Sequence, residues 1–233
     1  MATHFDKIAT EYHSIQNNLN SEVYIRIGEL LNSRIANKII LDIGNGGYFP
    51  YDTRLPSSII AVDVSNEMLK KIMDQKIKKI VGDARTLTAI ENDSIDLVLL
   101  LFCIHHVTGK NEMEAIRSMN EIVNAARLKL KKGGRLIVAE ATLNPVFYFI
   151  EKLLYKVFYF FMKIFGRDMV FFHSDANIIS SLTGTFQNKA SDIFIKRIKL
   201  KEPIDPIAGA FPGLIKIPPW LIYSRHNFYE VTK

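Results

Sequence analysis

Cysteine is nearly absent from the sequence, and this scarcity excludes several classes of protein. The one cysteine among 233 residues, Cys103, lies in the apolar run LVLLLFCIHHV. A single cysteine cannot form an intrachain disulfide framework and supplies no cluster of thiolates for a zinc site. A reducing compartment fits this usage, and we expect no metal site.

Long uncharged apolar runs are also missing. The N-terminal segment MATHFDKIATEY has no apolar stretch of the kind found in secretory signals, and the longest apolar stretch is interrupted by charges. We therefore expect a cytoplasmic protein. The net charge of +6 permits attraction to anionic surfaces. Zinc-finger spacing and an RNA-recognition signature are both lacking, so nucleic-acid binding is not expected.

Segments with strand and helix patterns alternate through the first 142 residues. Residues 21–36 place apolar side chains at helical spacing after Ser21, a candidate N-cap. Parallel neighbours in a sheet need crossover connections, so this alternation predicts a parallel, doubly wound α/β sheet. The expected strands are KIILDIG, SIIAVDVS, IKKIVGDA, SIDLVLLLFCIHH, RLIVAEA, DIFIKRIKLKE and RHNFYEVTK, and the further helices are NEMLKKIMDQ, capped by Ser65, and EMEAIRSMNEIVNAARLKL.

The stretch ILDIGNGGYFPYD, residues 40–52, predicts a buried strand that runs into a glycine-rich turn. Asp63 ends the next strand, 19 residues after Gly44. This is near the spacing expected for an acid that binds ribose hydroxyls at the carboxyl ends of parallel strands. The layout predicts a site for an adenosine-type ligand.

The dinucleotide fingerprint is incomplete in this turn, because Phe49 occupies the position of its third glycine. A pyrophosphate would also be repelled by carboxylates beside the turn. S-adenosylmethionine carries a sulfonium and an ammonium, so Asp42 and Asp52 would be favourable neighbours for it. The acids favour this cationic ligand over NAD or FAD.

Six motifs in sequence order give the chain its resemblance to a family. They are FDKIATEY, LDIGNGG, IIAVDVSNEML, GDARTL, SIDLVLLLFCIHHV and LKKGGRLIVAE. Over roughly residues 5–142 the chain resembles the class I S-adenosylmethionine-dependent methyltransferases of methyltransferase type 11, particularly the group that includes the ubiquinone/menaquinone-biosynthesis methyltransferases. The resemblance implies a Rossmann-like, seven-stranded, mostly parallel sheet whose last strand is antiparallel, with S-adenosylmethionine as cofactor.

The resemblance also implies roles for individual residues. Gly44 and Gly46 would let the backbone approach the methionine moiety, with Asp42 near its amino group. The other implied contacts are Asp63 with the ribose hydroxyls, Met68 near the adenine, Asp83 with the adenine amino group, the Ala84 backbone with the ring, and Tyr12 at the closure of the site. Asp63 and Asp83 could instead be strand-end caps, and Tyr12 a packing aromatic.

Position 48 departs from the glycine pattern of the family, which usually reads G-x-G-x-G. Tyr48 stands in the place of the last glycine, and Asn45 replaces a frequent cysteine or small residue. Either Gly47 shifts the turn by one residue, or Tyr48 narrows the pocket. A lost cofactor site is the alternative that this departure leaves open.

Methyl transfer from a sulfonium mainly requires alignment of the acceptor and exclusion of water, and a base only if the acceptor must lose a proton. His105 and His106 follow the fourth strand at the expected crevice and are the candidates for a base or for acceptor positioning. They could equally shape the pocket without transferring a proton. Glu140 is a second polar candidate, whereas Cys103 in an apolar run is expected to be packing.

An aromatic, basic segment follows the alternating part of the chain. Within residues 146–172, Lys152, Lys156 and Lys163 recur at spacings of four and seven among phenylalanines and tyrosines. Such a helix would lie on a membrane surface or cover an apolar substrate, and its alternative is an insertion packed on the core. We expect a single methyltransferase domain over residues 1–233, with residues 143–190 as a hydrophobic cap or lid.

The function expected from these observations is methyl transfer to a small apolar acceptor such as a quinone, isoprenoid, lipid or polyketide-like molecule. The apolar stretch IAGAFPGLIKIPPWLIY would form another wall of the site. Two alternatives remain: a cofactor-binding protein of the same fold with lost or different activity, and a peripheral membrane-binding module.

Overall fold

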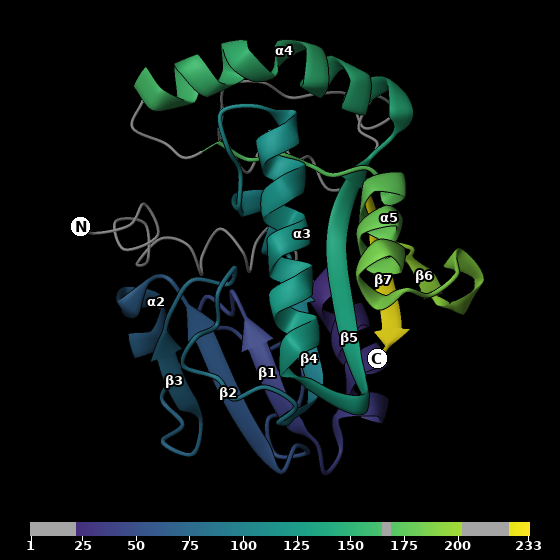
Figure 1. The fold of residues 1–233 in the computed structure, drawn as a ribbon. Coiled ribbons are helices and arrows are strands. Elements are labelled where there is room, and N and C mark those ends of the chain that lie inside the picture. Colours follow the sequence, from purple (N-terminus) through teal and green to yellow (C-terminus); the bar gives the residue numbers. More distant parts are fainter. Residues whose placement is uncertain (1–21, 165–168, 202–223) are drawn as a thin grey trace.

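A single mixed sheet organises the computed structural model, which describes residues 22–164, 169–201 and 224–233. Its strand order is β3-β2-β1-β4-β5-β7-β6 (Figure 1). The strands are β1 (Ile39–Ile43), β2 (Ser58–Asp63), β3 (Lys78–Val81), β4 (Ile95–Leu101), β5 (Leu130–Leu143), β6 (Phe194–Ile198) and β7 (Ser224–Thr232). β7 runs antiparallel to both β5 and β6, and the pairs from β3 to β5 are parallel. The expected seven-stranded, mostly parallel sheet is confirmed.

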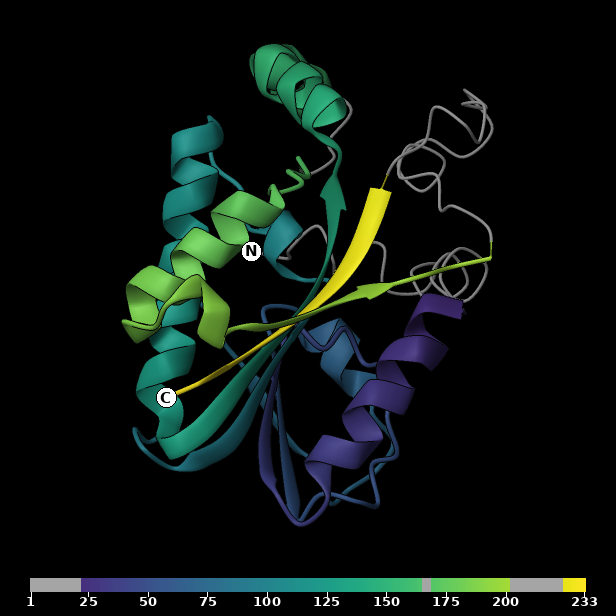
Figure 2. The same cartoon turned by 90° about the vertical axis from the view of Figure 1, so that its right-hand side faces the viewer.

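Helices cover both faces of this sheet. The helix of residues 22–35 lies on one face, and α3 (Glu112–Lys129) and α5 (Asp175–Phe186) lie on the other (Figure 2). The shorter helices are α2 (Asn66–Lys70) and the 3-10 turns η1 (Ile104–His106) and η2 (Ala190–Asp192). Because both faces are covered, the central strands carry unbroken apolar runs, and all of Leu97–Leu100 in β4 is buried.

Two expected elements are shorter in the structure than in the sequence pattern. The helix expected through NEMLKKIMDQ ends at Lys70, although Ile72 is still buried in the same core cluster as Leu69. The apolar spacing after Lys70 therefore reflects side chains that are buried without being helical. The fourth strand ends at Leu101, because Phe102 adopts a φ of +53° and turns the chain into η1.

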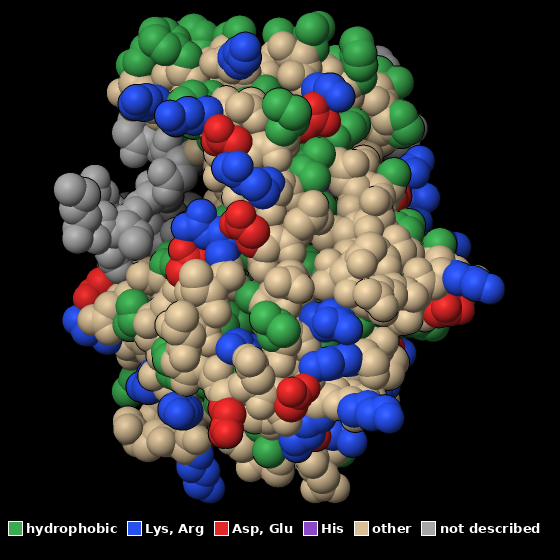
Figure 3. Space-filling view, viewed as in Figure 1, with side chains coloured by type: hydrophobic (Ala, Val, Ile, Leu, Met, Phe, Trp, Pro, Cys, Tyr) green, Lys and Arg blue, Asp and Glu red, His purple; other side chains and the backbone are tan. Residues whose placement is uncertain are grey.

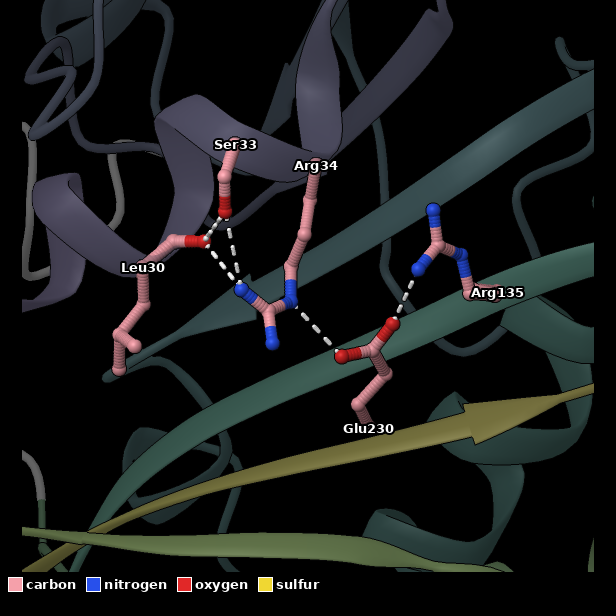
Figure 4. Close-up of polar contacts among 5 residues, drawn as sticks. All are labelled: Leu30, Ser33, Arg34, Arg135 and Glu230. Atoms are coloured by element: carbon pink, nitrogen blue, oxygen red, sulfur yellow. Dashed lines mark hydrogen bonds and ion pairs between the residues drawn. The ribbon is translucent and has the colours of Figure 1, made fainter.

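Ion pairs connect the helix of residues 22–35 to β7, the strand next to the β6 edge of the sheet. Arg34 donates from Nε to Glu230 Oε2 at 2.8 Å, and Arg135 Nη1 donates to Glu230 Oε1 at 2.5 Å (Figure 4). Arg34 Nη1 also donates to the Leu30 carbonyl oxygen at 2.7 Å. The Glu230 side chain is only 11% exposed, so one nearly buried carboxylate joins the helix, β5 and β7.

A long helix, α4 (Pro145–Ile164), lies across the carboxyl ends of the parallel strands (Figure 1). It packs on a small core cluster that includes Ala115, Tyr155 and Phe171, apart from the two main clusters of the sheet. Within the described part of the chain, α4 and the other helices fall short of the length and apolar content needed to cross a membrane. The segment Pro203–Pro219 and the FDKIATEY motif lie outside the described residues.

Candidate active site

A cavity of about 810 Å³ opens where the carboxyl ends of the parallel strands meet α4. Segments that follow four different strands contribute to its wall, together with η1 and α4. The lining residues include Gly44 and Gly46 after β1, Asp63 and Val64 after β2, Gly82–Arg85 after β3, Phe102, Cys103 and His106 after β4, and Tyr159 and Lys163 of α4. Ligands of doubly wound folds bind at this end of the sheet, so this cavity is the candidate active site.

The glycine turn needs its glycines for backbone reasons. Gly44, Gly46 and Gly47 have φ values of +67°, +62° and +79°, a region that other residues rarely adopt. A Cβ atom on Gly44 would lie 2.5 Å from Cys103 Cβ. Gly44 therefore has no room for a side chain, and Gly44 and Gly46 present backbone to the cavity.

Tyr48 does not line the large cavity. Its ring makes an edge contact with Tyr24 at a centroid distance of 5.0 Å, and it lines a separate hollow of about 20 Å³ on the other side of the turn. Of the two alternatives left by the sequence, a turn shifted to Gly47 agrees with the positive φ of that residue. The departure at position 48 consequently leaves the main cavity open.

Asn45 fixes the turn to the acid beneath it. Its Nδ2 donates to Asp42 Oδ2 and to the Tyr48 carbonyl oxygen, both at 2.9 Å, and its Oδ1 accepts from the Gly47 backbone N–H at 3.0 Å. Tyr51 Oη donates to the same Asp42 oxygen at 2.8 Å. Asn45 thus has a structural role that a smaller residue could not fill.

Asp42 is buried below the turn and lines the small hollow rather than the large cavity. Burial raises the pKa of its carboxyl to about 7, although the hydrogen bonds from Tyr51 and Asn45 act in the opposite direction. A positively charged ligand group beside the turn would favour the ionised form of Asp42.

Asp63 lines the cavity and ties the turn to β2. Its Oδ2 accepts from the Gly46 N–H at 2.9 Å, and its Oδ1 accepts from the Ser65 N–H at 2.8 Å. Each carboxylate oxygen has a second lone pair that can accept from a ligand hydroxyl. The cap role that the sequence left as an alternative is therefore present, and it is compatible with a binding role.

Asp83, Ala84 and Met68 also line the cavity, which brings together the residues expected on the adenine side. The Asp83 carboxylate accepts from Arg85 Nε and Nη2. These hydrogen bonds from Arg85 lower the pKa of Asp83. Sequence reasoning missed Arg85, although an arginine two residues from an acid in a turn is a local signal that could have been used.

His106 lines the cavity, whereas His105 lies beside it and is bound to Glu140. His105 Nδ1 is 2.6 Å from Glu140 Oε1, and the two histidine rings are 4.1 Å apart between centroids. Glu140 is fully buried at the end of β5, where its Oε2 accepts from the Ile104 N–H at 3.1 Å. A buried carboxylate thus fixes the orientation of the first histidine.

Two further histidines, His173 and His226, are buried near this pair and were not expected from the sequence. Burial lowers the pKa of each to about 4, and the Glu140 charge acts on both in the opposite direction. Among the described residues, no group of three or more His, Cys, Asp or Glu side chains is arranged to hold a metal ion. These histidines come from distant segments, so no local pattern could have revealed them.

The structure agrees with the expectation for Cys103 and differs from it for Asp52. Cys103 is buried, and burial raises the pKa of its thiol, so it is a packing residue of the cavity wall as expected. Asp52 was expected as a neighbour of the cationic ligand, but it lines neither cavity. Its carboxylate instead accepts from Arg54 Nη2 at 2.7 Å, which holds the chain after the turn. Tyr12 lies outside the described residues.

The chain is similar to known proteins in two ways: part of its sequence matches a domain family, and its fold matches solved structures. Residues 41–138 match the family model described as a methyltransferase domain. No curated protein shows significant similarity. A chain in the complex between the Haloferax volcanii Trm112 methyltransferase activator and a methyltransferase has a TM-score of 0.64 at 15% identity, with 98% of each chain covered.

Two other solved structures have the same fold. A SAM-dependent methyltransferase from Thermotoga maritima has a TM-score of 0.62 at 16% identity, with 98% of each chain covered. The N-methyltransferase NodS from Bradyrhizobium japonicum, solved with S-adenosyl-L-homocysteine, has a TM-score of 0.55 at 11% identity, with 92% of this chain and 87% of that chain covered. The domain match over residues 41–138, on a sheet of this order with its cavity at the strand ends, identifies the enzyme class as S-adenosylmethionine-dependent methyltransferase, with S-adenosylmethionine as cofactor.

Proposed function

We propose that the chain transfers a methyl group to a small apolar acceptor such as a quinone, isoprenoid, lipid or polyketide-like molecule. The observation that carries this proposal is the composition of the cavity beyond the cofactor side. Val107, Tyr159 and Met169 give it an apolar wall there, and Phe102 and Cys103 add further apolar surface, beside the polar side chains of Thr108, Lys110, Glu114 and Lys163. Its volume of about 810 Å³ lies in the upper part of the range of roughly 300 to 1,000 Å³ found for small-molecule pockets. The proposal includes the subgroup that the motifs resemble, the ubiquinone/menaquinone-biosynthesis methyltransferases.

The residues proposed to hold the cofactor are those at the strand ends. Bound S-adenosylmethionine supplies a methyl group on a sulfonium, which is already an activated leaving group. Gly44 and Gly46 would receive the methionine moiety on bare backbone, with Asp42 as the nearby negative charge. Asp63 would accept from the ribose hydroxyls, and Met68, Asp83 and Ala84 would border the adenine. Tyr12 would help to close the site.

The cap proposed for this site comprises α4 and residues 169–173, within the expected 143–190 segment. Tyr159 and Lys163 of α4 and Met169 line the cavity. Residues of α5 such as Ile178 and Leu182 instead belong to the main core of the sheet. Exclusion of water by α4 would favour the displacement reaction, because water competes with the acceptor and screens the reacting charges.

His106 is the proposed base where the acceptor must lose a proton, because it is the histidine that lines the cavity. His105 and Glu140 are proposed as positioning residues, since their 2.6 Å contact fixes the His105 ring, which lies tilted beside the His106 ring. In this reaction the acceptor atom would form a bond to the methyl carbon, its proton would pass to His106, and the sulfonium would leave as a thioether.

Calorimetric titration of the full chain with S-adenosylmethionine and S-adenosylhomocysteine tests the cofactor part. Asp63→Ala should weaken binding by roughly tenfold or more, because it removes a charged acceptor worth about 1.5–3 kcal/mol per hydrogen bond. Asp63→Asn keeps the size and one acceptor oxygen, and Asp96→Ala is the matched control at the opposite end of the sheet. Absence of binding of either ligand at high micromolar concentration contradicts the proposal and favours a protein that has lost the cofactor.

Transfer of a labelled methyl group to a panel of quinols, isoprenoids and small amines tests the acceptor part. The proposal expects turnover with apolar acceptors, and turnover confined to amines contradicts it. With an accepted substrate, Glu140→Gln should lower kcat and alter the pH profile while KM for the cofactor stays unchanged. Full turnover by His106→Ala at every pH would remove the base from the mechanism.

A further inference from the structure

An ordinary surface helix buries its apolar side chains, but many apolar side chains of α4 are exposed to solvent. Two of its tyrosines point their hydroxyls into the protein: Tyr155 Oη donates to the Gly109 carbonyl oxygen at 2.7 Å, and Tyr148 Oη donates to Glu112 Oε1 at 2.9 Å. Glu151 is buried as well, where its Oε1 accepts from the Phe172 N–H at 3.0 Å. The inward side of α4 is therefore held to the rest of the protein by these hydrogen bonds.

The other side of α4 carries an apolar stripe that faces solvent, hereafter the outer stripe. Its members recur every three or four residues, so they lie along one line of the helix. They are Val146, Phe149, Leu153, Val157, Phe160 and Ile164, with exposed fractions from 48% to 69%. A helix of this length extends over roughly 28 Å at 1.5 Å per residue. Figure 3 shows hydrophobic side chains gathered along this edge of the molecule, over α4.

The charges on α4 are distributed to suit an anionic partner. Lys152, Lys156 and Lys163 are exposed, and helical geometry places all three along one side of the outer stripe. Lys152 also pairs with Glu112 of α3 at 3.0 Å, so Lys156 and Lys163 carry most of the excess positive charge. The acid of the helix, Glu151, is turned inward. An exposed apolar line bordered by cations is the pattern of helices that lie in the interface of anionic bilayers, where the apolar side chains enter the acyl boundary and the lysines meet the phosphates.

We propose that α4 docks parallel to the surface of an anionic lipid bilayer through the outer stripe. A second copy of the chain fits this surface poorly, because paired outer stripes would bring lysines together with no exposed acid on α4 to neutralise them. A bilayer with anionic headgroups complements both the apolar line and its basic border. The docked helix also contributes Tyr159 and Lys163 to the cavity wall, so docking would set that wall against the lipid interface.

This geometry gives an apolar acceptor a direct route from the bilayer to the cavity. That part rests on the proposed function, whereas docking itself needs neither cofactor nor methyl transfer. The two proposals can therefore fail separately.

Flotation of the full chain with vesicles tests docking. We expect the protein to float with vesicles of mixed phosphatidylglycerol and phosphatidylcholine, to bind phosphatidylcholine vesicles more weakly, and to lose part of its binding in high salt. Lys156→Gln should lower the affinity for the anionic vesicles about fivefold, since one lysine near such a surface contributes about 1 kcal/mol.

Variants of the outer stripe supply the sharper comparison. Leu153→Glu and Phe160→Glu should each reduce vesicle binding by roughly tenfold or more, because a carboxylate resists transfer to the acyl boundary. Met73→Glu is the matched control, since Met73 is 81% exposed but lies far from α4 in the sequence and outside the stripe. Circular dichroism and cofactor binding of each variant report whether the fold is retained.

Three outcomes overturn the proposal. One is the absence of flotation with anionic vesicles, and another is binding by the two stripe variants that equals binding by Met73→Glu. The third is a dimer in sedimentation velocity that Leu153→Glu converts to monomers, with no vesicle binding, because a second copy would then cover the stripe. Cofactor binding without vesicle binding refutes docking alone, and vesicle binding without cofactor binding refutes the proposed function alone.

Discussion

Replacement of Gly44 by alanine should destabilise the glycine turn through two separable effects. The first is backbone strain, because the φ of +67° is unfavourable for a residue with a Cβ atom. The second is a collision, because that Cβ would lie 2.5 Å from Cys103 Cβ. Gly133 provides a matched control: its φ is +78°, and a Cβ atom there would meet nothing within 4 Å.

The expected loss of stability differs between the two variants because only Gly44→Ala adds a collision to the backbone strain. A left-handed conformation costs roughly 1–2 kcal/mol for an L-residue, and overpacking costs about 1–3 kcal/mol more. Gly133→Ala should carry only the first cost, and Gly44→Ala should carry both. In a chain of this size 1 kcal/mol moves Tm by roughly 2–4 °C, so Gly44→Ala should unfold some 2–12 °C below Gly133→Ala.

Thermal unfolding followed by circular dichroism and urea titration measure this difference in the free energy of unfolding. Calorimetry should show in addition that Gly44→Ala binds S-adenosylmethionine roughly tenfold or more weakly, since a small displacement of a binding loop is sufficient for such a loss. Gly133→Ala should retain the affinity of the unchanged protein. Equal Tm values and equal affinities for the two variants would refute the reasoning.

Two further predictions concern stability. Glu230→Gln should lower the free energy of unfolding by about 2–4 kcal/mol in urea titrations, because Arg34 and Arg135 lose a nearly buried carboxylate. Asp93 pairs with Lys233 at 2.7 Å but is 69% exposed, so Asp93→Asn should lower it by less than about 1 kcal/mol. The pKa of His173 is lowered to about 4 from 6.5, so its contribution to stability is present above pH 6.5 and is lost as the pH falls toward 4. His173→Phe should therefore gain stability relative to the unchanged protein by about 2 kcal/mol between pH 7 and pH 5, and a difference that stays constant with pH contradicts this sign.

The sheet and the acids at its edge could be predicted because their signals are local. Continuous apolar runs identified the buried strands, and Asp42, Asp63 and Asp83 each end or follow a strand whose carboxyl end lies at one edge of the sheet. The sequence also singled out His105 and Glu140 as candidates. Their contact could not be predicted, because it joins residues 35 positions apart through the pairing of β4 with β5.

The missed features depend on tertiary packing or on backbone geometry. The end of β4 at Phe102 depends on a positive φ that an apolar run conceals. Asn45 was identified only as a departure from a family pattern, yet its three hydrogen bonds fix the turn. Asp52 was assigned to the ligand because it follows the turn, but the structure pairs it with Arg54. Proximity in sequence was a poor guide there, since the chain has already left the cavity.

The position of β7 between β5 and β6 has a consequence for the order in which the sheet can form during synthesis. β6 pairs only with β7 in the described sheet, although it is made more than twenty residues earlier. Until residues 224–232 leave the ribosome, β6 has no strand to pair with, and the edge of β5 stays open to other chains. One late strand, β7, therefore completes two pairings at once, with β5 and with β6.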